Sequence, residues 1–153
     1  MINKFNYYFV TLLIFGDSVQ KYRGTWASLF TVLFIFTIIY FLKISIFIVT
    51  ILFFIILFYS YFAIVSSLKN FKDSDPQEIV IDEFVGQAIP LLAVSIYETL
   101  YPMTLLFYYI LSFVVFRFFD ILKPYPINYI DKNTKGSLGI MFDDIIAGIF
   151  ATI

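Results

Sequence analysis

Long apolar runs separated by short polar stretches dominate this chain. The run at residues 26–65 contains a single charge, Lys43, and is too long for one membrane helix, so we divide it there into helices of about 16 and about 22 residues. Each resulting helix is close to the length that crosses a bilayer, roughly 20 residues. The pattern predicts four spanning helices, over residues 26–42, 44–65, 84–100 and 103–119.

Shorter segments flank these four helices. An apolar run at residues 5–15 is too short to cross a bilayer, and no signal-peptide cleavage site follows it, so we expect a packed or interfacial helix there. A last helix is expected to begin at Phe142, and because only nine residues follow Asp144 it is either short and held by its neighbours or lacks its natural end. We expect loops, turns and irregular structure elsewhere, at 16–24, 66–81, 98–102 and 127–141.

The composition agrees with a membrane protein. Hydrophobic residues make up 61% of the chain and charged residues 14%, against about 45–50% and about 25% in ordinary soluble domains. We therefore expect an all-α integral membrane protein that forms one domain over residues 1–153. The chain has no cysteine and no histidine, which leaves carboxylates, hydroxyls, Lys, Arg and a metal ion for any catalysis. A site of this kind favours Mg²⁺.

The alternation of the four helices places most polar groups on one side of the membrane. The start of the first helix, the loop at 66–81, the start of the third helix and the stretch 117–144 all lie on this side. Only the turns at Lys43 and at 98–102 lie opposite. Most of the basic residues share the first side: Lys21, Arg23, Lys69, Lys72, Arg117, Lys123, Lys132 and Lys135. The positive-inside rule then makes that face cytoplasmic.

Two acidic pairs stand beside apolar helices on that face. Asp82-Glu83 is followed by Gly86, and Asp143-Asp144 by Ala147-Gly148. Small residues one turn from the acids allow two helices to approach closely in lipid, which would bring both pairs to one cation. Acids near a helix start also serve as caps and dipole partners, so one pair alone would be ambiguous. The repeated arrangement favours a metal site formed by Asp82, Glu83, Asp143 and Asp144.

Other polar residues near these pairs are candidates for phosphate contacts. Arg117 and Asp120 are three residues apart, which suits either an ordinary salt bridge or an arginine that binds phosphate in a bidentate manner. Lys123 fits a lysine that snorkels to the interface, or a substrate contact. Asp131 fits a substrate contact or a solvated loop.

Three motifs resemble the bacterial phosphatidylglycerophosphatase A family. They are IDEFVGQ at 81–87, FRFFDILKPYPI at 116–127 and DKNTKGSLGIMFDDIIAG at 131–148, in the order and spacing of that family. GTWASL at 24–29 is similar to a weaker form of the family's PGTxGS opening, with Arg23 in place of its proline and Ala27 in place of a glycine. The resemblance covers most of the chain from residue 16 onward.

The resemblance implies an enzyme that removes the terminal phosphate of phosphatidylglycerophosphate with Mg²⁺, at the inner face of a bacterial membrane. It implies a metal site and catalytic carboxylates at Asp82, Glu83, Asp143 and Asp144, with Asp120 as a further catalytic acid. It implies substrate contacts at Arg117, Lys123, Asp131, Gly24 and Thr25. We expect the phospholipid and the membrane as partners and no nucleic acid, and the oligomeric state is left open.

Two other functions are compatible with parts of the pattern. A non-catalytic membrane subunit or an ion carrier would account for acids in an apolar chain, although a carrier should hold its acids in mid-membrane. A carboxylate- and Mg-dependent lipid transferase also places acids at helix ends. However, the sequence lacks the last acid of a DDxxD motif and has no DGxxAR run.

Overall fold

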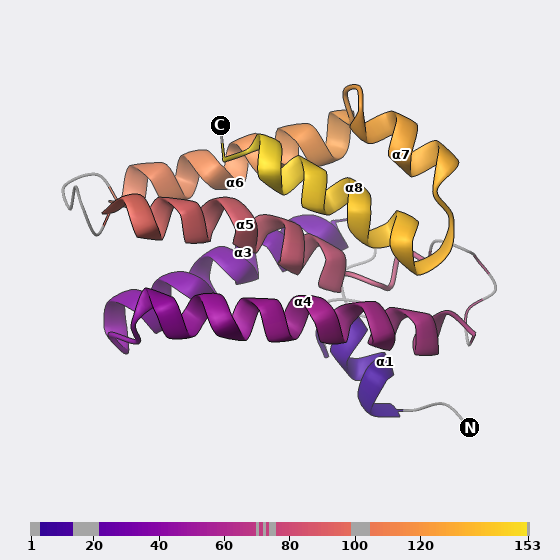
Figure 1. Ribbon diagram of the computed structural model, residues 1–153, viewed down its shortest axis with the longest axis horizontal. Helices are drawn as coiled ribbons and strands as arrows, with labels where there is room; N and C mark the ends of the chain where they lie inside the picture. Colours follow the sequence, from indigo (N-terminus) through magenta and orange to yellow (C-terminus); the bar gives the residue numbers. More distant parts are fainter. Residues whose placement is uncertain are drawn as a thin grey trace.

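The computed structural model describes residues 4–13, 22–69, 71, 73, 76–98 and 105–152, and within these residues its regular elements are all helices (Figure 1). The elements are α1 (Lys4–Val10), α3 (Arg23–Phe36), the π-helical η1 (Thr37–Phe41), α4 (Ile46–Leu68), α5 (Ile81–Glu98), α6 (Leu105–Leu122), α7 (Ile127–Asn133) and α8 (Gly136–Phe150). The helices α3 (continued by η1), α4, α5 and α6 run along the long axis of the molecule (Figure 1). The predicted all-α class is confirmed.

Two segments are long and apolar enough to cross a membrane. They are Arg23–Phe41, which joins α3 and η1, and Ile46–Leu68, which is α4, and only 22% of each is buried within the molecule. Lys43 lies in the turn between them with a φ of 52°. Ser45 then caps α4, because its side chain accepts a hydrogen bond from the Ile48 N–H at 3.4 Å. The predicted division of the apolar run at residues 26–65 at Lys43 is confirmed.

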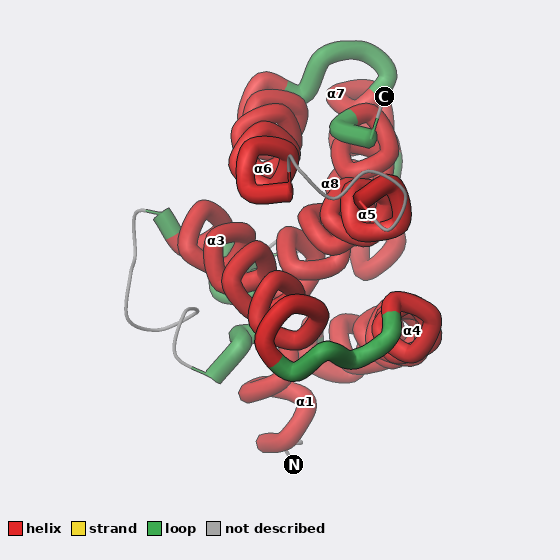
Figure 2. Tube along the Cα trace, turned by 90° about the vertical axis from the view of Figure 1, so that its left-hand side faces the viewer, coloured by secondary structure: helices red, strands yellow, loops and turns green. Residues whose placement is uncertain are grey.

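α5 is the central helix of the bundle. It packs against α3, α4, α6 and α8, and the view along the bundle shows it between these neighbours (Figure 2). Its buried side chains include Val85, Gln87, Ala88 and Leu91. A helix enclosed by protein on several sides can carry polar residues that a lipid-facing helix could not. α5 therefore brings its acidic first turn into the interior of the molecule.

α5 and α8 approach each other closely where two glycines meet. A Cβ on Gly86 would lie 2.7 Å from the carbonyl oxygen of Asp144 and 2.8 Å from the Phe116 ring, and a Cβ on Gly148 would collide with the carbonyl oxygen of Gly86. That carbonyl also lacks its usual helical donor, because Pro90, four residues later, has no N–H. The close approach predicted from the small residues is confirmed.

The N-terminal helix α1 packs against α4. The Tyr59 hydroxyl donates a hydrogen bond of 2.7 Å to the Asn6 side chain, and the Phe9 and Tyr59 rings meet edge to face with 4.8 Å between centroids. The Val80 N–H donates to the Val10 carbonyl at 2.9 Å, which ties α1 to the segment before α5. The apolar run at residues 5–15 thus forms the short packed helix that the sequence predicts, over the part that the structure describes.

The stretch 127–141 is helical, and the prediction of irregular structure there is wrong. α7 and α8 occupy it, so the last helix begins at Gly136 rather than at Phe142. Its polar residues resemble a loop in sequence, but Ile127 of α7 is buried in a cluster with Phe116 and Ala147, and Ile140 of α8 is buried in the cluster that includes residues of α4 and α5. The acids of the second pair consequently lie inside α8 and not at its start.

The predicted loops are described only in part. The segment 66–81 is shorter than expected, because α4 continues to Leu68 and α5 begins at Ile81. Pro76, Ile79 and Val80 of this segment are buried against the end of the bundle. Most of the loop expected at 16–24, and all but the first residue of the turn expected at 98–102, lie outside the described residues.

Candidate active site

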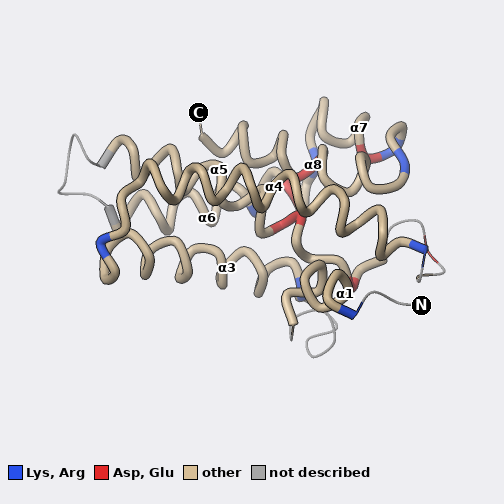
Figure 3. Tube along the Cα trace, turned by 60° about the horizontal axis from the view of Figure 1, so that its bottom comes forward, with Lys and Arg blue, Asp and Glu red and all other residues tan. Residues whose placement is uncertain are grey.

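A cavity of about 420 Å³ lies at the end of the bundle where α3 and α5 begin and α6 ends. This volume is within the range of small-molecule sites, about 300–1,000 Å³. Figure 3 shows acidic positions gathered inside the bundle beside α8. The wall is formed by Tyr22, Arg23, Gly24, Thr25, Pro76, Gln77, Ile79, Asp82, Glu83, Arg117, Asp120, Ile121, Lys123, Ile140, Asp143 and Asp144.

Three carboxylates meet in this cavity. Asp82 and Glu83 come from the first turn of α5 and Asp144 from α8, and one oxygen of each lies within 4.8 Å of the others. Asp82 Oδ1 and Glu83 Oε2 are buried without a hydrogen-bond partner. Within the described parts of the chain, no Lys or Arg forms an ion pair with any of the three. Carboxylates this close repel one another strongly when they are shielded from water. A cation bound between them would remove this repulsion.

The crossing of α5 and α8 is what assembles this carboxylate cluster. Gly86 lies one helical turn after Asp82 and Glu83, and Gly148 lies one turn after Asp144. Because the backbones touch at the two glycines, the acids one turn away are held at side-chain distance from one another. Side chains larger than hydrogen at either glycine would push the two helices apart.

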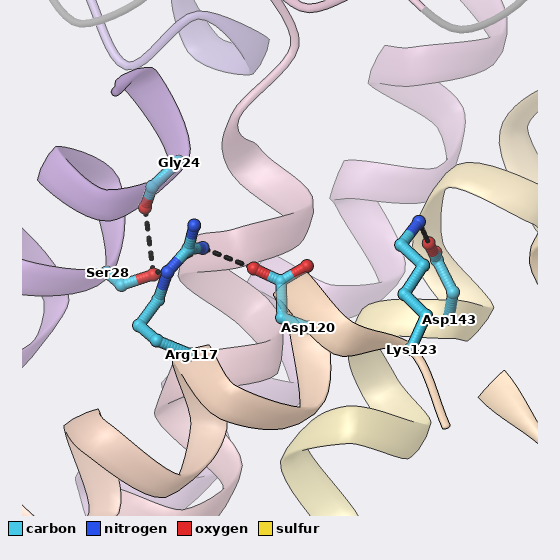
Figure 4. Close-up of polar contacts among 6 residues, drawn as sticks. All are labelled: Gly24, Ser28, Arg117, Asp120, Lys123 and Asp143. Atoms are coloured by element: carbon cyan, nitrogen blue, oxygen red, sulfur yellow. Dashed lines mark hydrogen bonds and ion pairs between the residues drawn. The ribbon is translucent and has the colours of Figure 1, made fainter. Parts of the chain in front are cut away.

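Arg117 and Asp120 form an ion pair on α6, at the wall of the cavity (Figure 4). The Arg117 guanidinium also donates a long hydrogen bond of 3.5 Å to the Ser28 hydroxyl, which itself donates to the Gly24 carbonyl at 2.8 Å. Arg117 Nε is buried without a partner. The structure thus contains the predicted salt bridge and also places this arginine where a phosphate in the cavity can reach it.

Lys123 connects the end of α6 to α7 and α8. Its ammonium group donates to Asp131 at 2.5 Å and to Asp143 at 2.6 Å, the second contact being drawn in Figure 4. Burial by itself would lower the pKa of Lys123, but these two carboxylates outweigh burial and raise the pKa above its usual range. The backbone φ of Lys123 is 42°, which is uncommon for a residue other than glycine. The side chain therefore points to the acids and does not snorkel to the interface.

Gly24 lies against Glu83 and Arg117. A Cβ at this position would collide with the Glu83 carboxylate and would lie 3.2 Å from the Arg117 guanidinium. Thr25 follows in the first turn of α3 and also lines the cavity. The absence of a side chain at position 24 therefore leaves room for the Glu83 carboxylate and the Arg117 guanidinium to lie beside the start of α3.

Asp143 and Asp131 lie next to the carboxylate cluster. Asp143 uses Oδ2 to accept the hydrogen bond from Lys123, while its Oδ1 is buried without a partner. Asp131 lines a neighbouring cavity of about 150 Å³, and Asp143 lines both cavities. Every predicted site residue thus lines the first cavity except Asp131. Asp131 contacts the cavity residue Lys123 by accepting a hydrogen bond from it.

Arg23 is a cavity residue that sequence reasoning did not assign to the site. It precedes Gly24-Thr25 directly, yet a basic residue at the start of an apolar run is also what membrane topology produces. Tyr22 and Gln77 line the cavity as well, and neither carries a sequence signal that would have distinguished it. Only the folded arrangement brings these residues to the wall.

The carboxylate cluster fits a divalent metal ion. It offers oxygen ligands only, which Mg²⁺ prefers, and two of its buried oxygens have no other partner. Asp82, Glu83 and Asp144 form the set that could hold one ion. Asp143, which the sequence grouped with them, is bonded to Lys123 and stands beside this set.

Comparisons with known proteins show the family to which this chain is similar. The family profile described as Phosphatidylglycerophosphatase A matches residues 8–153. A provisionally named phosphatidylinositol-3-phosphatase of Bacteroides thetaiotaomicron is 31% identical over 141 residues, which cover 91% of this chain and 85% of that protein. No solved structure matches the chain.

Two relatives are named phosphatidylglycerophosphatase A. The protein of Haemophilus influenzae is 46% identical over 80 residues, which cover 52% of this chain and 44% of the relative. The protein of Escherichia coli is 39% identical over 77 residues, which cover 50% of this chain and 41% of the relative. Each of these alignments spans less than half the length of the relative.

The family match begins within α1 and includes every residue that lines the cavity. The family description and the names of these two relatives are those of a phosphatase, in agreement with a cavity that combines a carboxylate cluster with basic side chains. The protein is an enzyme of this type, and the chain belongs to the phosphatidylglycerophosphatase A family.

Proposed function

We propose that this protein removes the terminal phosphate of phosphatidylglycerophosphate in a reaction that depends on Mg²⁺. The observation that carries the proposal is the cluster of Asp82, Glu83 and Asp144, close to one another in the wall of a cavity that also contains Arg117 and Lys123. A phosphomonoester needs positive charge around its oxygens for hydrolysis. The cluster and the two basic residues together are suited to provide it.

The residues have distinct roles in this proposal. Asp82, Glu83 and Asp144 would hold Mg²⁺, which when bound would supply positive charge for the phosphate oxygens. Arg117 and Lys123 stabilise the negative charge that develops as water bonds to phosphorus and the bond to the glycerol oxygen breaks. The ion pairs of Arg117 with Asp120 and of Lys123 with Asp143 hold the two cations in place before the substrate arrives.

Phosphate release from phosphatidylglycerophosphate by purified protein in detergent micelles tests this function. We expect release with Mg²⁺, loss of release with EDTA, recovery on adding Mg²⁺ back, and little release by Asp144→Asn. Asp73→Asn is the matched control, because Asp73 is exposed and does not line the cavity. Release that neither EDTA nor Asp144→Asn affects would contradict the metal site.

A second substrate is supported by the name of the relative whose alignment covers most of this chain. Phosphatidylinositol 3-phosphate also carries a phosphomonoester on a lipid headgroup, and the same residues would act on it. The assay therefore includes this lipid at the same mole fraction. A higher kcat/KM for phosphatidylinositol 3-phosphate than for phosphatidylglycerophosphate would identify it as the preferred substrate. The assignment of the site residues would then remain unchanged.

We further propose four spanning segments, α3 with η1, α4, α5 and α6, with the cavity at the cytoplasmic face of a bacterial membrane. The beginnings of α3 and α5 and the end of α6 line the cavity, while the turn between η1 and α4 lies at the other end of the bundle (Figure 1). Most basic residues belong to the cavity end, in agreement with the positive-inside rule.

Cysteine labelling tests this orientation, because the chain has no cysteine of its own. In intact cells, a maleimide that does not cross the membrane should label Lys43→Cys and should not label Lys132→Cys. Both variants should react after the cells are permeabilised, which is the control for accessibility. Labelling of Lys132→Cys alone in intact cells would show that the protein has the opposite orientation.

A further inference from the structure

Arg23 is a third basic side chain in the wall of the cavity. Its side chain is only 12% exposed, and its Nε is buried without a hydrogen-bond partner. Its ion pair with Glu78 is loose, with 3.5 Å between Nη1 and Oε1, and the Glu78 side chain is 38% exposed. A partly exposed pair of this length contributes little to stability. Part of the hydrogen-bonding capacity of this guanidinium is therefore unused.

The other two basic residues of the cavity have closer partners. Arg117 is paired with Asp120, and Lys123 with Asp131 and Asp143. Arg117 lies in the last turns of α6, and Lys123 directly follows this helix. Arg23 instead begins α3, and its partner belongs to the segment before α5. The basic side chains of the cavity thus come from two parts of the fold, the end of α6 and the start of α3.

We propose that Arg23 binds the phosphodiester of the lipid, the phosphate that joins the headgroup to diacylglycerol, while the terminal phosphate lies at Arg117, Lys123 and the cluster. This inference rests on the proposed function. A phosphatidyl lipid with a phosphorylated headgroup carries two phosphates, and the cavity offers basic side chains from two parts of the fold. Arg23 is a specificity-determining residue in this arrangement, because a lipid that lacks the diester cannot engage it.

The chemistry of arginine suits this role. A guanidinium presents parallel N–H donors that match two oxygens of one phosphate, and it keeps its charge when buried. The Glu78 carboxylate lies 3.5 Å from Arg23 Nη1 and is not part of the cavity wall. Glu78 therefore holds Arg23 in place when the cavity contains no lipid and yields it to the phosphodiester.

Inhibition by two simple ligands separates the two phosphate positions. Dioctanoyl phosphatidylglycerol carries the diester and no terminal phosphate, and inorganic phosphate represents the terminal phosphate alone. In Arg23→Gln we expect the inhibition constant of phosphatidylglycerol to rise by at least about tenfold, because a hydrogen bond to a charged group is lost. The constant of inorganic phosphate should change by less than about twofold. KM for phosphatidylglycerophosphate should rise with kcat nearly unchanged, and Arg23→Lys should restore part of the loss.

Glu78→Gln distinguishes a binding role from a structural one. If Arg23 serves the lipid, removing its competitor leaves the inhibition constant of phosphatidylglycerol unchanged or lowers it. If the Arg23–Glu78 pair is only a structural tie, Glu78→Gln and Arg23→Gln weaken inhibition and lower the melting temperature alike, which would overturn the proposal. An equal effect of Arg23→Gln on both inhibitors, or no effect on either, would also overturn it.

A binding measurement keeps this inference separate from the proposed function. Trp26 is the single tryptophan of the chain and lies three residues after Arg23, so its fluorescence can follow the titration of dioctanoyl phosphatidylglycerol without any turnover. Dioctanoylglycerol, which lacks phosphate, is the control for the acyl chains. Binding that Arg23→Gln weakens supports the inference even if no phosphate is released. Release of phosphate with binding that Arg23→Gln leaves intact supports the function and overturns the inference.

Discussion

Asp82 and Glu83 lie in the first turn of α5 and both reach the carboxylate cluster, whereas Asp143 and Asp144 lie inside α8 and divide between two partners. Asp144 joins the cluster, and Asp143 accepts a hydrogen bond from Lys123. Neighbouring residues of an α-helix project about 100° apart, so two adjacent acids reach one point only when a longer side chain compensates. Glu83 has the additional methylene, and Asp143 does not. Two similar acidic pairs thus give three candidate ligands and one residue that orients a lysine.

The largest effect that sharpens this comparison is expected within the second pair. Asp144→Asn removes a proposed metal ligand, so kcat/KM should fall by more than about 100-fold, and the Mg²⁺ concentration for half-maximal activity should rise. Asp143→Asn removes only the contact to Lys123, and losses from such supporting residues are about 10–100-fold. Steady-state kinetics over a range of Mg²⁺ concentrations measures both variants. Equal losses with equal Mg²⁺ dependence would remove the distinction between the two acids.

A smaller effect is expected from forcing the two pairs apart. Gly148→Ala places a methyl group against the Gly86 carbonyl, and overpacking of this kind costs about 1–3 kcal/mol. Thermal unfolding in detergent should show a lower melting temperature, together with weaker activation by Mg²⁺. Ile149→Ala is the matched control, because this neighbouring side chain is 47% exposed. A melting temperature that falls no further in Gly148→Ala than in Ile149→Ala would contradict the close crossing.

The smallest effect concerns the pH dependence of the Lys123 contact. The pKa of Lys123 is raised on folding, so its contribution to stability is fully present below the unfolded pKa of about 10.4 and is lost only as pH rises through the folded pKa. The difference in melting temperature between the wild-type protein and Lys123→Met should therefore be the same at pH 7 and at pH 9. A difference that shrinks markedly by pH 9 would show that the two carboxylates do not hold the charge of this lysine.

The sequence predicts the long helices and the acids of the site well, because both signals are strong. A single lysine in a long apolar run divides α3 with η1 from α4, and acids next to apolar helices are rare enough to be informative. Glycines one turn from those acids predict the approach of α5 and α8. These features depend on local patterns and on the properties of the membrane as a solvent.

The parts that the sequence does not predict depend on tertiary packing. The beginning of α8 contains polar residues and glycines that are typical of a loop, and it is helical where Ile140 and Met141 pack into the core cluster with residues of α4 and α5. A helix that began at Phe142, as the sequence predicts, would have both acids of the second pair at its start. Their different roles follow from their place inside the helix. Arg23 was likewise one basic residue among several until folding placed it in the cavity wall.

The contact between Gly86 and Gly148 acts as a pivot for α5 and α8. A change of about 10° in the crossing angle would move a point one helical turn from the pivot by only about 1 Å, and the far end of α5 by about 3 Å. Helices tilt when the bilayer becomes thinner or thicker. Because the acids lie one turn from the pivot, such tilting leaves their spacing almost constant. The spacing of the clustered carboxylates would thereby change little with the thickness of the lipid around them.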